Sequence, residues 1–492
     1  MVSLSHRRRA LPLRGFGYFL WEKRWLWLVV GLGAILVALG PPSGFSPAGY
    51  GALILLVGAA VLFVTEPIPA PAVALLIVVG QVLFLGRSST AVAQSLMSDA
   101  VLFILGALML SVAMVKQRLD RRIAALIVRV TGGSVVSVCF GLTLVSGALA
   151  ALIGEHTVAA MMLPVAITLV RHAANDPAQI RRVAPVLLFS IAYGCAIAAI
   201  ATPAGAARNA IVLALWEGFA APAGDASSAT PLAQPTVDYV TWVLYAAPVF
   251  LVLAPLIAAL LIATFRPRSA DFADAVAAMK LQLAKEPPMG GRDYAVAGVF
   301  ALTVVGWVMF SGAFGYGPVA FVAVAFLLIT GLVRWADLNA GVNWGVVVLY
   351  GALISLGLEL INTGAAQSVA SIALGLLGTL GLDDGLGLTA AIAVISAGAS
   401  NIMSNGAAVA VIGPLTLQMA QGAGESVITA GFATAIGSGF AFLSVIGTPA
   451  CTIIYSSGLV RPGDFVRAGI GPVVLSILVL VFMAAFYWPL LG

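Results

Sequence analysis

The sequence predicts an all-α polytopic membrane protein with 11 transmembrane helices and two re-entrant hairpins. Of its 492 residues, 61% are hydrophobic and only 9% are charged, whereas a soluble domain carries about 25% charged residues. Apolar stretches long enough to cross a bilayer recur from Trp25 to the C-terminus. A chain in hydrocarbon must satisfy its backbone hydrogen bonds internally, so we expect these stretches to be helices.

The apolar runs follow one another along the whole chain. They cover residues 25–40, 48–65, 70–86, 99–116, 134–170, 183–216, 237–264, 293–311, 317–333, 343–361, 387–420, 428–458 and 465–490. Two of them are interrupted by polar residues, the first by Gly154-Glu155-His156-Thr157 and the second by Ser400-Asn401 and Ser404-Asn405-Gly406. Arms of roughly 15 residues around a polar apex are short for full spans. We therefore expect two re-entrant hairpins that reach the middle of the membrane.

The positions of the basic residues orient the chain. If both interruptions are hairpins and the N-terminus is cytoplasmic, every Lys and Arg faces the cytoplasm except Arg87, outside, and Arg208, within the membrane. The predicted outer loops 217–240 and 362–386 contain acidic residues and no basic ones. This separation is a positive-inside signal and places the C-terminus outside. The net charge of +5 thus reflects topology and not nucleic-acid binding.

The remaining composition excludes several other classes of protein. No small-residue cleavage site follows a short apolar segment, so the first span is expected to be uncleaved. The three cysteines lie in apolar segments and predict no disulfide framework. Besides His156, the histidines are His6 and His172 in predicted cytosolic segments, so no zinc site is expected.

An internal repeat divides the chain into two halves. Three pairs of landmarks share nearly one offset: Gly106 with Gly351 (351 − 106 = 245), Gly154 with Ser404 (404 − 154 = 250), and Thr202-Pro203 with Thr448-Pro449 (448 − 202 = 246). Each half contains five predicted crossings, an odd number, so the second half must be inverted in the membrane. Inverted repeats with broken helices and a midplane site are typical of secondary transporters.

Each half also contains a predicted helix break. Thr202-Pro203-Ala204-Gly205 and Gly447-Thr448-Pro449 interrupt apolar runs, and proline both removes a donor and clashes with the preceding turn. A broken helix frees carbonyl groups for a cation and exposes a helix N-terminus to an anion. The alternative is a kink that serves packing alone, because transmembrane helices tolerate proline.

Several motifs together resemble the divalent anion:sodium symporter (DASS) family, which includes sodium-coupled dicarboxylate and citrate carriers. They are Thr65-Glu66-Pro67-Ile68-Pro69-Ala70-Pro71, Ala159-Ala160-Met161-Met162-Leu163-Pro164, and Thr448-Pro449 followed by Ile453-Ile454-Tyr455-Ser456-Ser457-Gly458. The resemblance extends from about Trp25 to the end of the chain. It implies a homodimer in a bacterial inner membrane, in which a transport domain moves like an elevator against a scaffold. It also implies sodium-driven uptake of dicarboxylates, tricarboxylates or sulfate.

The repeat and the resemblance together predict the domain organisation. In the first half, a cytosolic tail (1–24) precedes four scaffold helices (25–130) and transport half A (131–264), which contains hairpin 134–170 and broken helix 183–216. A cytosolic amphipathic linker (265–292) leads to the second half. There, three scaffold helices (293–362) precede transport half B (385–492), which contains hairpin 387–420, broken helix 428–458 and the last helix. The carboxylates Glu66 and Glu359 lie near span ends, where a capping or pairing role in the scaffold is expected.

The chain departs from the family pattern at the expected site. The family places Ser-Asn-Thr at both hairpin tips, but here the first tip reads Gly154-Glu155-His156 and the second Ser404-Asn405-Gly406. The first break has Ala207-Arg208 in place of Pro-Pro, and the second has Cys451 in place of Asn. Ionisable groups thus replace neutral ones, which leaves both the coupling ion and the substrate open.

The resemblance and the repeat nominate two overlapping sets of site residues. Expected to bind substrate are Gly154, Glu155, His156, Thr157, Arg208, Ser404, Asn405, Gly406, Thr448 and Pro449. Expected to couple a cation are Glu155, Thr202, Gly205, Asn209, Asn401, Ser404, Asn405 and Thr448, with Na⁺ near Ser404, Asn405 and Thr448 and H⁺ at Glu155.

Glu155 and Arg208 are the charged residues placed within the membrane, where an ionisable group is a functional hypothesis by default. Glu155 suits a proton carrier, and the planar fork of Arg208 suits a carboxylate or sulfate. The alternative is a permanent ion pair that holds two elements together. The two roles can also alternate, with substrate displacing Glu155 from Arg208 as Glu155 takes a proton. His156 is either a proton relay or anion contact, or a polar helix cap.

These residues favour a secondary active symporter for a small anion, with H⁺ slightly preferred over Na⁺ as the coupling ion. A cation/proton antiporter with Glu155 as the exchange carboxylate is the first alternative, although Arg208 would repel Na⁺. An anion exchanger of the same architecture is a further alternative. We expect no enzyme, because the sequence shows no nucleophile–base pair or metal cluster. The expected partners are the anion, the bilayer and a second copy of the chain.

Overall fold

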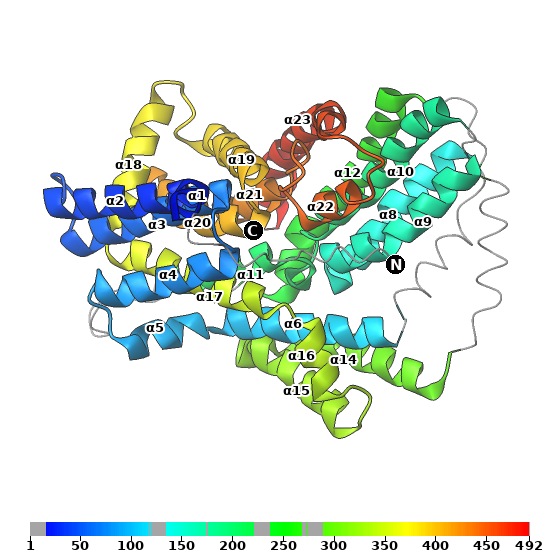
Figure 1. Ribbon diagram of the computed structural model, residues 1–492, viewed down its shortest axis with the longest axis horizontal. Helices are drawn as coiled ribbons and strands as arrows, with labels where there is room; N and C mark the ends of the chain where they lie inside the picture. The colour runs from blue at the N-terminus through cyan, green and yellow to red at the C-terminus, as the bar shows by residue number, and fades with distance from the viewer. Residues whose placement is uncertain are drawn as a thin grey trace.

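The computed structural model describes residues 16–117, 119, 134–173, 176–220, 237–267, 272 and 289–491. Within these ranges the regular elements are α-helices and two short 3₁₀ helices (Figure 1), which confirms the predicted helical class. Nine of the described helices are long and apolar enough to cross a membrane, and five shorter apolar helices accompany them. The count of eleven crossings stays a prediction. Most of the predicted linker 265–292 lies outside the described residues.

The first half of the chain folds into helices that coincide with its apolar runs. They are α1 (Phe16–Glu22), α2 (Arg24–Leu39), α3 (Pro47–Thr65), α4 (Ala70–Leu83), α5 (Ser89–Leu96), α6 (Asp99–Lys116), α8 (Val135–Ile153), α9 (Glu155–Ala173), α10 (Pro177–Ala198), η2 (Pro203–Gly205), α11 (Ala207–Ala220) and α12 (Tyr239–Phe265). The breaks predicted at the first tip and in the first broken helix are both present.

The second half repeats this order. Its elements are α14 (Gly291–Phe314), α15 (Tyr316–Ile329), α16 (Trp335–Gly341), α17 (Trp344–Asn362), α18 (Ala365–Gly378), α19 (Gly385–Ile402), α20 (Asn405–Ala423), α21 (Val427–Ser438), α22 (Pro449–Tyr455), α23 (Pro462–Phe486) and η3 (Trp488–Leu490). Helices α8 and α9 begin 250 residues before α19 and α20 (385 − 135 = 250; 405 − 155 = 250). The structure thus contains the repeat that the landmarks predict.

Two sequence expectations about individual segments are wrong. The predicted loop 362–386 contains the helix α18, which packs against α20 and α3. The hairpin arms are longer than the predicted 15 residues, because α8, α9 and α20 have 19 residues and α19 has 18. At about 1.5 Å per residue each arm is about 28 Å long. Polar and basic residues at the ends of the apolar segments continue the helices, so arm length does not favour re-entrant hairpins over full spans, and the hairpins stay a prediction.

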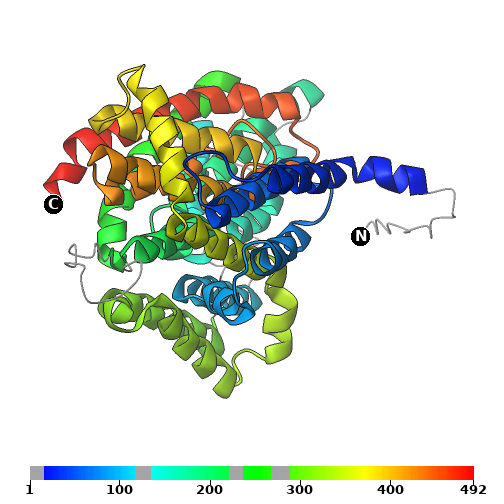
Figure 2. The same ribbon diagram turned by 90° about the vertical axis from the view of Figure 1, so that its left-hand side faces the viewer.

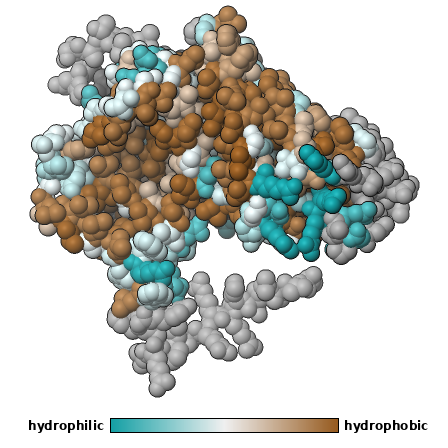
Figure 3. Space-filling view, turned by 90° about the horizontal axis from the view of Figure 1, so that it is seen from above, coloured by the Kyte–Doolittle hydropathy of each residue, from teal (hydrophilic) through white to brown (hydrophobic). Residues whose placement is uncertain are grey.

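The two halves interlock through their central helices. Helix α6 of the first half packs against α15 of the second, and α17 of the second packs against α4 of the first. A bundle forms from α8, α10 and α12 of the first half and α19, α21 and α23 of the second, through contacts among these helices (Figures 1 and 2). Apolar side chains cover much of the face shown in Figure 3, with hydrophilic groups confined to patches. Such a surface suits contact with lipid.

Asp99 joins the two halves by capping a helix of the opposite repeat. Its carboxylate accepts hydrogen bonds from the backbone N–H groups of Tyr316 and Gly317, at 2.8 and 2.9 Å, at the start of α15. Charge-assisted bonds to a helix N-terminus are among the stronger ones in proteins. Gly317 has no room for a side chain, because a Cβ there would meet Asp99.

We expect Asp99→Ala to lower the free energy of unfolding by about 1.5–3 kcal/mol, because two backbone donors lose a charged partner. Thermal unfolding of the purified protein in detergent measures this. Asp384→Ala is the matched control, because Asp384 is an exposed residue before α19 whose side chain makes no capping bond. Equal effects of the two substitutions would contradict the proposed helix cap.

Candidate substrate site

Both hairpin tips and both helix breaks converge at the centre of the structure. At the first tip Gly154 ends α8 with a positive φ of 88°, a conformation that favours glycine, and α9 starts at Glu155. At the second tip Asn405 begins α20, and its N–H donates to the carbonyl of Gly447 at 3.3 Å. Helix α9 also packs against α22. The tips therefore lie against the broken helices, as the repeat predicts.

Glu155 and Arg208 form a buried ion pair at this centre. Glu155 Oε1 lies 3.5 Å from Arg208 Nη1, and the two side chains are 8% and 1% exposed. The second carboxylate oxygen, Glu155 Oε2, and Arg208 Nε have no hydrogen-bond partner among the described residues. The pair is thus incompletely satisfied, and because a partly unpaired buried charge is costly, the pair is a candidate functional site.

Arg208 is held by three oxygen atoms from three parts of the chain. Besides Glu155, its Nη2 donates to the carbonyl of Ala196 at 2.9 Å. With the Asn405 carboxamide oriented to satisfy its surroundings, Asn405 Oδ1 accepts from Arg208 Nη1 at 2.8 Å. In that orientation the amide nitrogen donates to the carbonyls of Ser438 (3.2 Å) and Gly447 (2.5 Å). Arg208 therefore links the first tip to the second.

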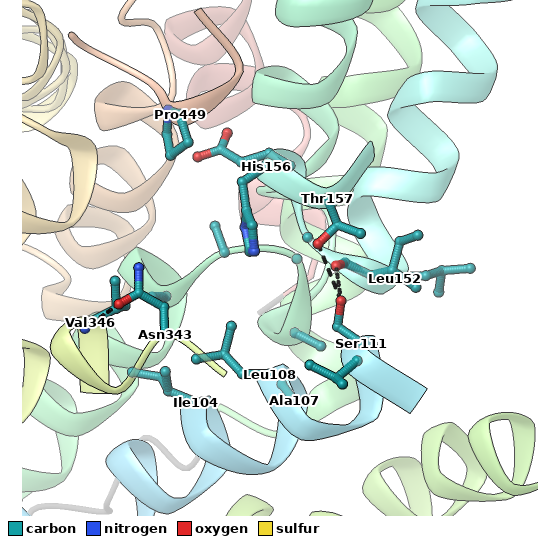
Figure 4. Close-up of a pocket in the computed structure, with 18 of the residues that line it drawn as sticks. Ile104, Ala107, Leu108, Ser111, Leu152, His156, Thr157, Asn343, Val346 and Pro449 are labelled. Carbon is teal, nitrogen blue, oxygen red and sulfur yellow. Dashed lines mark hydrogen bonds between the residues drawn. The ribbon is translucent and has the colours of Figure 1, made fainter. Parts of the chain in front are cut away.

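A cavity of about 730 Å³ opens beside the first tip (Figure 4). Its walls come from α6, the first tip, the first break, α16–α17 and the start of α22: Phe103, Ile104, Ala107, Leu108, Ser111, Val112, Val115, Leu152, Ile153, Gly154, Glu155, His156, Thr157, Ala160, Met161, Pro203, Ala204, Gly205, Ala206, Ala207, Ala210, Gly341, Asn343, Val346, Tyr350 and Pro449. Glu155 lines this cavity, and Arg208 lies behind it. Glu155 Oε2 is itself buried, so the ion pair lies within the wall of the cavity.

Two helices, α9 and α11, begin in the wall of the cavity, at Glu155 and Ala207. The N-terminus of a helix carries a partial positive charge and unpaired N–H groups, so it favours an anion. The imidazole of His156 also points into the space, and Thr157 Oγ1 lies 3.2 Å from Ser111 Oγ of α6 (Figure 4). The electrostatics of this wall suit a negatively charged ligand.

The second tip divides its residues between two environments. Ser404 is exposed and lines a separate cavity of about 450 Å³, together with Lys23 and Glu66. Gly406 lies against the ring of Tyr350 so closely that a Cβ would overlap it. The predicted site residues of this tip are therefore not gathered around one ligand space in this conformation.

The remaining predicted residues brace the breaks. Asn209 Nδ2 donates to the carbonyls of Ala199 and Thr202, at 2.8 Å each. Asn401 Oδ1 accepts from the N–H of Leu443 at 2.7 Å, and Thr448 Oγ1 caps α22 by accepting from Cys451 N–H at 3.0 Å.

The Thr202 hydroxyl donates to the carbonyl of Ala151 in the first hairpin. Gly205 packs against the backbone of Ala199, and a Cβ there would overlap the Ala199 carbonyl. These groups fix the shape of the site in this conformation.

The comparisons with known proteins decide the family. The model of the sodium:sulfate symporter transmembrane region matches residues 20–492. The chain belongs to this family. It is 26% identical over 466 residues to an uncharacterized transporter of Haemophilus influenzae, with 90% of this chain and 93% of that protein aligned.

One further relative and one solved structure complete the comparison. The transporter is 26% identical over 475 residues to the sodium-dependent high-affinity dicarboxylate transporter 3 of Caenorhabditis elegans, which covers 86% of this chain and 80% of that protein. The crystal structure of the Alcanivorax borkumensis YdaH transporter aligns over 96% of this chain and 99% of its own with 15% identity and a TM-score of 0.49. The predictions of the DASS family and of a transporter, not an enzyme, are confirmed by the family match.

Sequence reasoning missed several residues of the transporter's central region. Tyr350 and Asn343 line the cavity from α17 and the residue before it, and Ser111 lines it from α6. The carbonyls of Ala196 and Ser438 contact Arg208 and Asn405. Tyr350, Asn343 and Ser111 carry hydroxyl or amide groups in or beside apolar spans, which is a signal that could have identified them. No sequence signal identifies a backbone carbonyl.

Proposed function

We propose that the transporter is a cation-coupled symporter of a small anion, most simply a dicarboxylate, tricarboxylate or sulfate-like oxyanion. The observation that carries this proposal is the ion pair of Glu155 and Arg208, buried in the wall of a cavity where the helices α9 and α11 begin. The C. elegans relative is named as a sodium-dependent dicarboxylate transporter, and the matched family model is named for sodium:sulfate symport. Both names agree with an anion as the substrate.

Proton coupling at the first tip is proposed on the geometry of this pair. While Glu155 is ionised, it neutralises Arg208, and the site carries no net charge. When Glu155 takes a proton at its unpaired Oε2, Arg208 stays anchored by Ala196 and Asn405. The site then carries one positive charge beside the helix N-termini, which attracts the anion. Anion and proton therefore bind together, which is the requirement for symport.

Sodium coupling at the second tip is proposed on different atoms. The carboxamide of Asn405 meets the carbonyl oxygens of Ser438 and Gly447, and the buried hydroxyl of Ser400 has no partner among the described residues. Oxygen ligands of this kind suit a hard cation. In this conformation the Asn405 amide nitrogen donates to both carbonyls and its oxygen accepts from Arg208, so a Na⁺ ion needs Asn405 to turn. Ser404 faces the second cavity and Thr448 caps α22, so their participation needs a rearrangement.

The larger architecture is proposed on the repeat and on the family. The paired helices α8–α9 and α19–α20 act as re-entrant hairpins of a transport domain, which moves like an elevator against scaffold helices that include α3, α4, α14 and α15. The functional unit is a homodimer in a bacterial inner membrane, with the N-terminus in the cytoplasm. The close contact of Gly406 with Tyr350 joins the second hairpin tip to α17. Such a movement would change this contact.

Counterflow in proteoliposomes tests the proposed function. Vesicles loaded with one unlabelled anion are diluted into its labelled form, for succinate, citrate and sulfate, with and without Na⁺ and a pH gradient. We expect counterflow for at least one anion, and net uptake that rises with an inward proton gradient. Na⁺/H⁺ exchange without counterflow of any anion would support the antiporter instead. Counterflow without a response to H⁺ or Na⁺ gradients would support the anion exchanger.

One ion pair outside the membrane spans provides a control for pH experiments. Asp337 in the short helix α16 pairs with Lys116 at the end of α6, and its Oδ2 also lies 3.4 Å from Arg334 Nε. The hydrogen bond from Lys116, followed by one from the Arg334 backbone, lowers the pKa of Asp337 to about 2. This pair therefore contributes to stability above the unfolded pKa near 4, and that contribution is lost as the pH falls towards 2.

We expect Asp337→Asn to leave the pH profile of uptake unchanged between about pH 5 and pH 8, because Asp337 is ionised throughout that range. Initial uptake rates across this range, set against wild-type rates, measure the effect. A profile displaced by one pH unit or more would show that the Lys116–Asp337 pair participates in coupling.

A further inference from the structure

When the two helix breaks are aligned, Arg208 corresponds to a residue of the second half that carries no charge. Helix α11 starts at Ala207 and α22 at Pro449 (449 − 207 = 242). Gly205 and Gly447 have the same separation, and each lies against the residue six positions earlier: a Cβ would overlap the Ala199 carbonyl at Gly205, and the Ala441 side chain and the Ser400 carbonyl at Gly447. In this alignment Arg208 corresponds to Ala450. The two Thr-Pro sequences, Thr202-Pro203 and Thr448-Pro449, do not correspond to each other.

The atoms around Arg208 are repeat-related as well. Two of its oxygen partners, on Glu155 and Asn405, occupy equivalent positions at the two tips (405 − 155 = 250). The third, the carbonyl of Ala196, corresponds to the carbonyl of Ser438 (438 − 196 = 242), which accepts from Asn405. The first half thus offers the Glu155 carboxylate and the Ala196 carbonyl to the guanidinium, whereas in the second half the equivalent carbonyl of Ser438 accepts from the tip side chain of Asn405. Arg208 places a charge between the two oxygens of the first half, and Ala450 contributes none to the second.

We propose that Arg208 is a tethered cation that replaces a bound Na⁺ in the first half of the transporter. The oxygens around its guanidinium are a carboxylate, a carbonyl and an amide, which are ligands of a hard cation. A tethered charge occupies this position permanently, so the first half has no need of an external cation and only the proton on Glu155 changes the charge there. This inference rests on the proposed function, because it assigns the coupling ion of the same site.

The consequence is that removal of Arg208 creates a sodium site. In Arg208→Ala the carboxylate of Glu155 and the carbonyl of Ala196 lose their cation, and an uncompensated buried carboxylate is strongly unfavourable. A Na⁺ ion of similar charge restores the balance. Arg208→Lys keeps the charge in place and is therefore not expected to bind the additional ion.

Sodium binding to the purified full-length protein tests this inference. Labelled ²²Na⁺ is bound at constant ionic strength, with K⁺ or choline as the replacing ion, and its stoichiometry per chain is measured. We expect Arg208→Ala to bind one Na⁺ more than the wild type, and Arg208→Lys and the exposed control Arg461→Ala to bind the wild-type number. The double variant Glu155→Gln/Arg208→Ala should lose the additional ion. A folded Arg208→Ala protein with wild-type stoichiometry would overturn the inference.

The design separates this inference from the proposed function. If the wild type binds no Na⁺, the second-tip site is wrong, but the difference between wild type and Arg208→Ala still decides the role of Arg208. If Arg208→Ala is recovered poorly, purification in Na⁺ or guanidinium chloride at low concentration should restore a monodisperse protein, whereas K⁺ should not. Poor recovery in all three salts, with normal recovery of the double variant, would show that Arg208 has no replaceable cation role.

Discussion

Glu155→Gln is expected to abolish uptake driven by a pH gradient while preserving counterflow of the anion. Gln occupies nearly the same volume and can still accept a hydrogen bond from Arg208, but it cannot take a proton. In a wild-type symporter that carries one proton per anion, each unit of inward pH gradient supports about tenfold accumulation. We expect this accumulation to disappear in the variant. Proteoliposome uptake at several imposed gradients measures it.

Other titratable groups near Glu155 define the controls for this experiment. Arg208, Tyr350, Cys195 and Cys451 lie within electrostatic range of the carboxylate, and His156 is its neighbour at the tip. Glu155→Asp keeps a carboxylate and should retain gradient-driven uptake, whereas His156→Gln should retain it unless the imidazole relays the proton. Accumulation by Glu155→Gln at the wild-type level would refute the proton-carrier role.

Gly205→Ala is expected to be the most disruptive of the conservative substitutions at the first break. A Cβ at this position would overlap the backbone of Ala199, which cannot move without displacing the end of α10 and Arg208. Overpacking of this kind costs about 1–3 kcal/mol or more, and here it also displaces the segment that carries Arg208. We expect a lower unfolding temperature together with loss of counterflow.

Gly398→Ala is the matched control for this substitution. Gly398 lies inside α19, and a Cβ there would meet no atom within 4 Å. Alanine is favoured over glycine in a helix interior by about 1 kcal/mol, so this variant should be at least as stable as the wild type and should transport normally. A Gly205→Ala protein with wild-type unfolding temperature and counterflow would show that the backbone at residue 205 can move away from Ala199 without loss of function.

Hydrophobic periodicity and charge distribution predicted most of the fold. The helices α2, α3, α4 and α6 begin and end within a few residues of the predicted runs, because a membrane span must be apolar along its whole length. Two shorter helices do not follow from composition. Helix α18 has 14 residues, as many as α4, but Gln367, Ser368 and Ser371 divide its apolar residues. Helix α16 has only seven residues, too few for composition to distinguish it from a loop.

The candidate site was predicted in its members but not in its arrangement. Glu155, Arg208 and Asn405 were all nominated from the tips and the break, and the structure places them in contact. The expectation that substrate contact by Arg208 is favoured over a fixed pair stays a prediction, since Arg208 lies behind the cavity wall in this conformation. Its equivalence to Ala450 was hidden, because the repeated Thr-Pro pairs suggested a register that differs by four residues (246 − 242 = 4).

By itself the sequence determined the class of the protein, its helices, its repeat and two charged residues, Glu155 and Arg208, that the fold buries. Each of these properties depends on local composition or on spacing along the chain, since the bilayer imposes a length and a polarity on every span. The tertiary structure decided which groups neutralise those charges. The carbonyls of Ala196 and Ser438 belong to the backbone, and their orientation depends on where α10 and α21 end. These carbonyls reach Arg208 and Asn405 only in the folded chain, because residue types in the sequence do not indicate where a backbone carbonyl points.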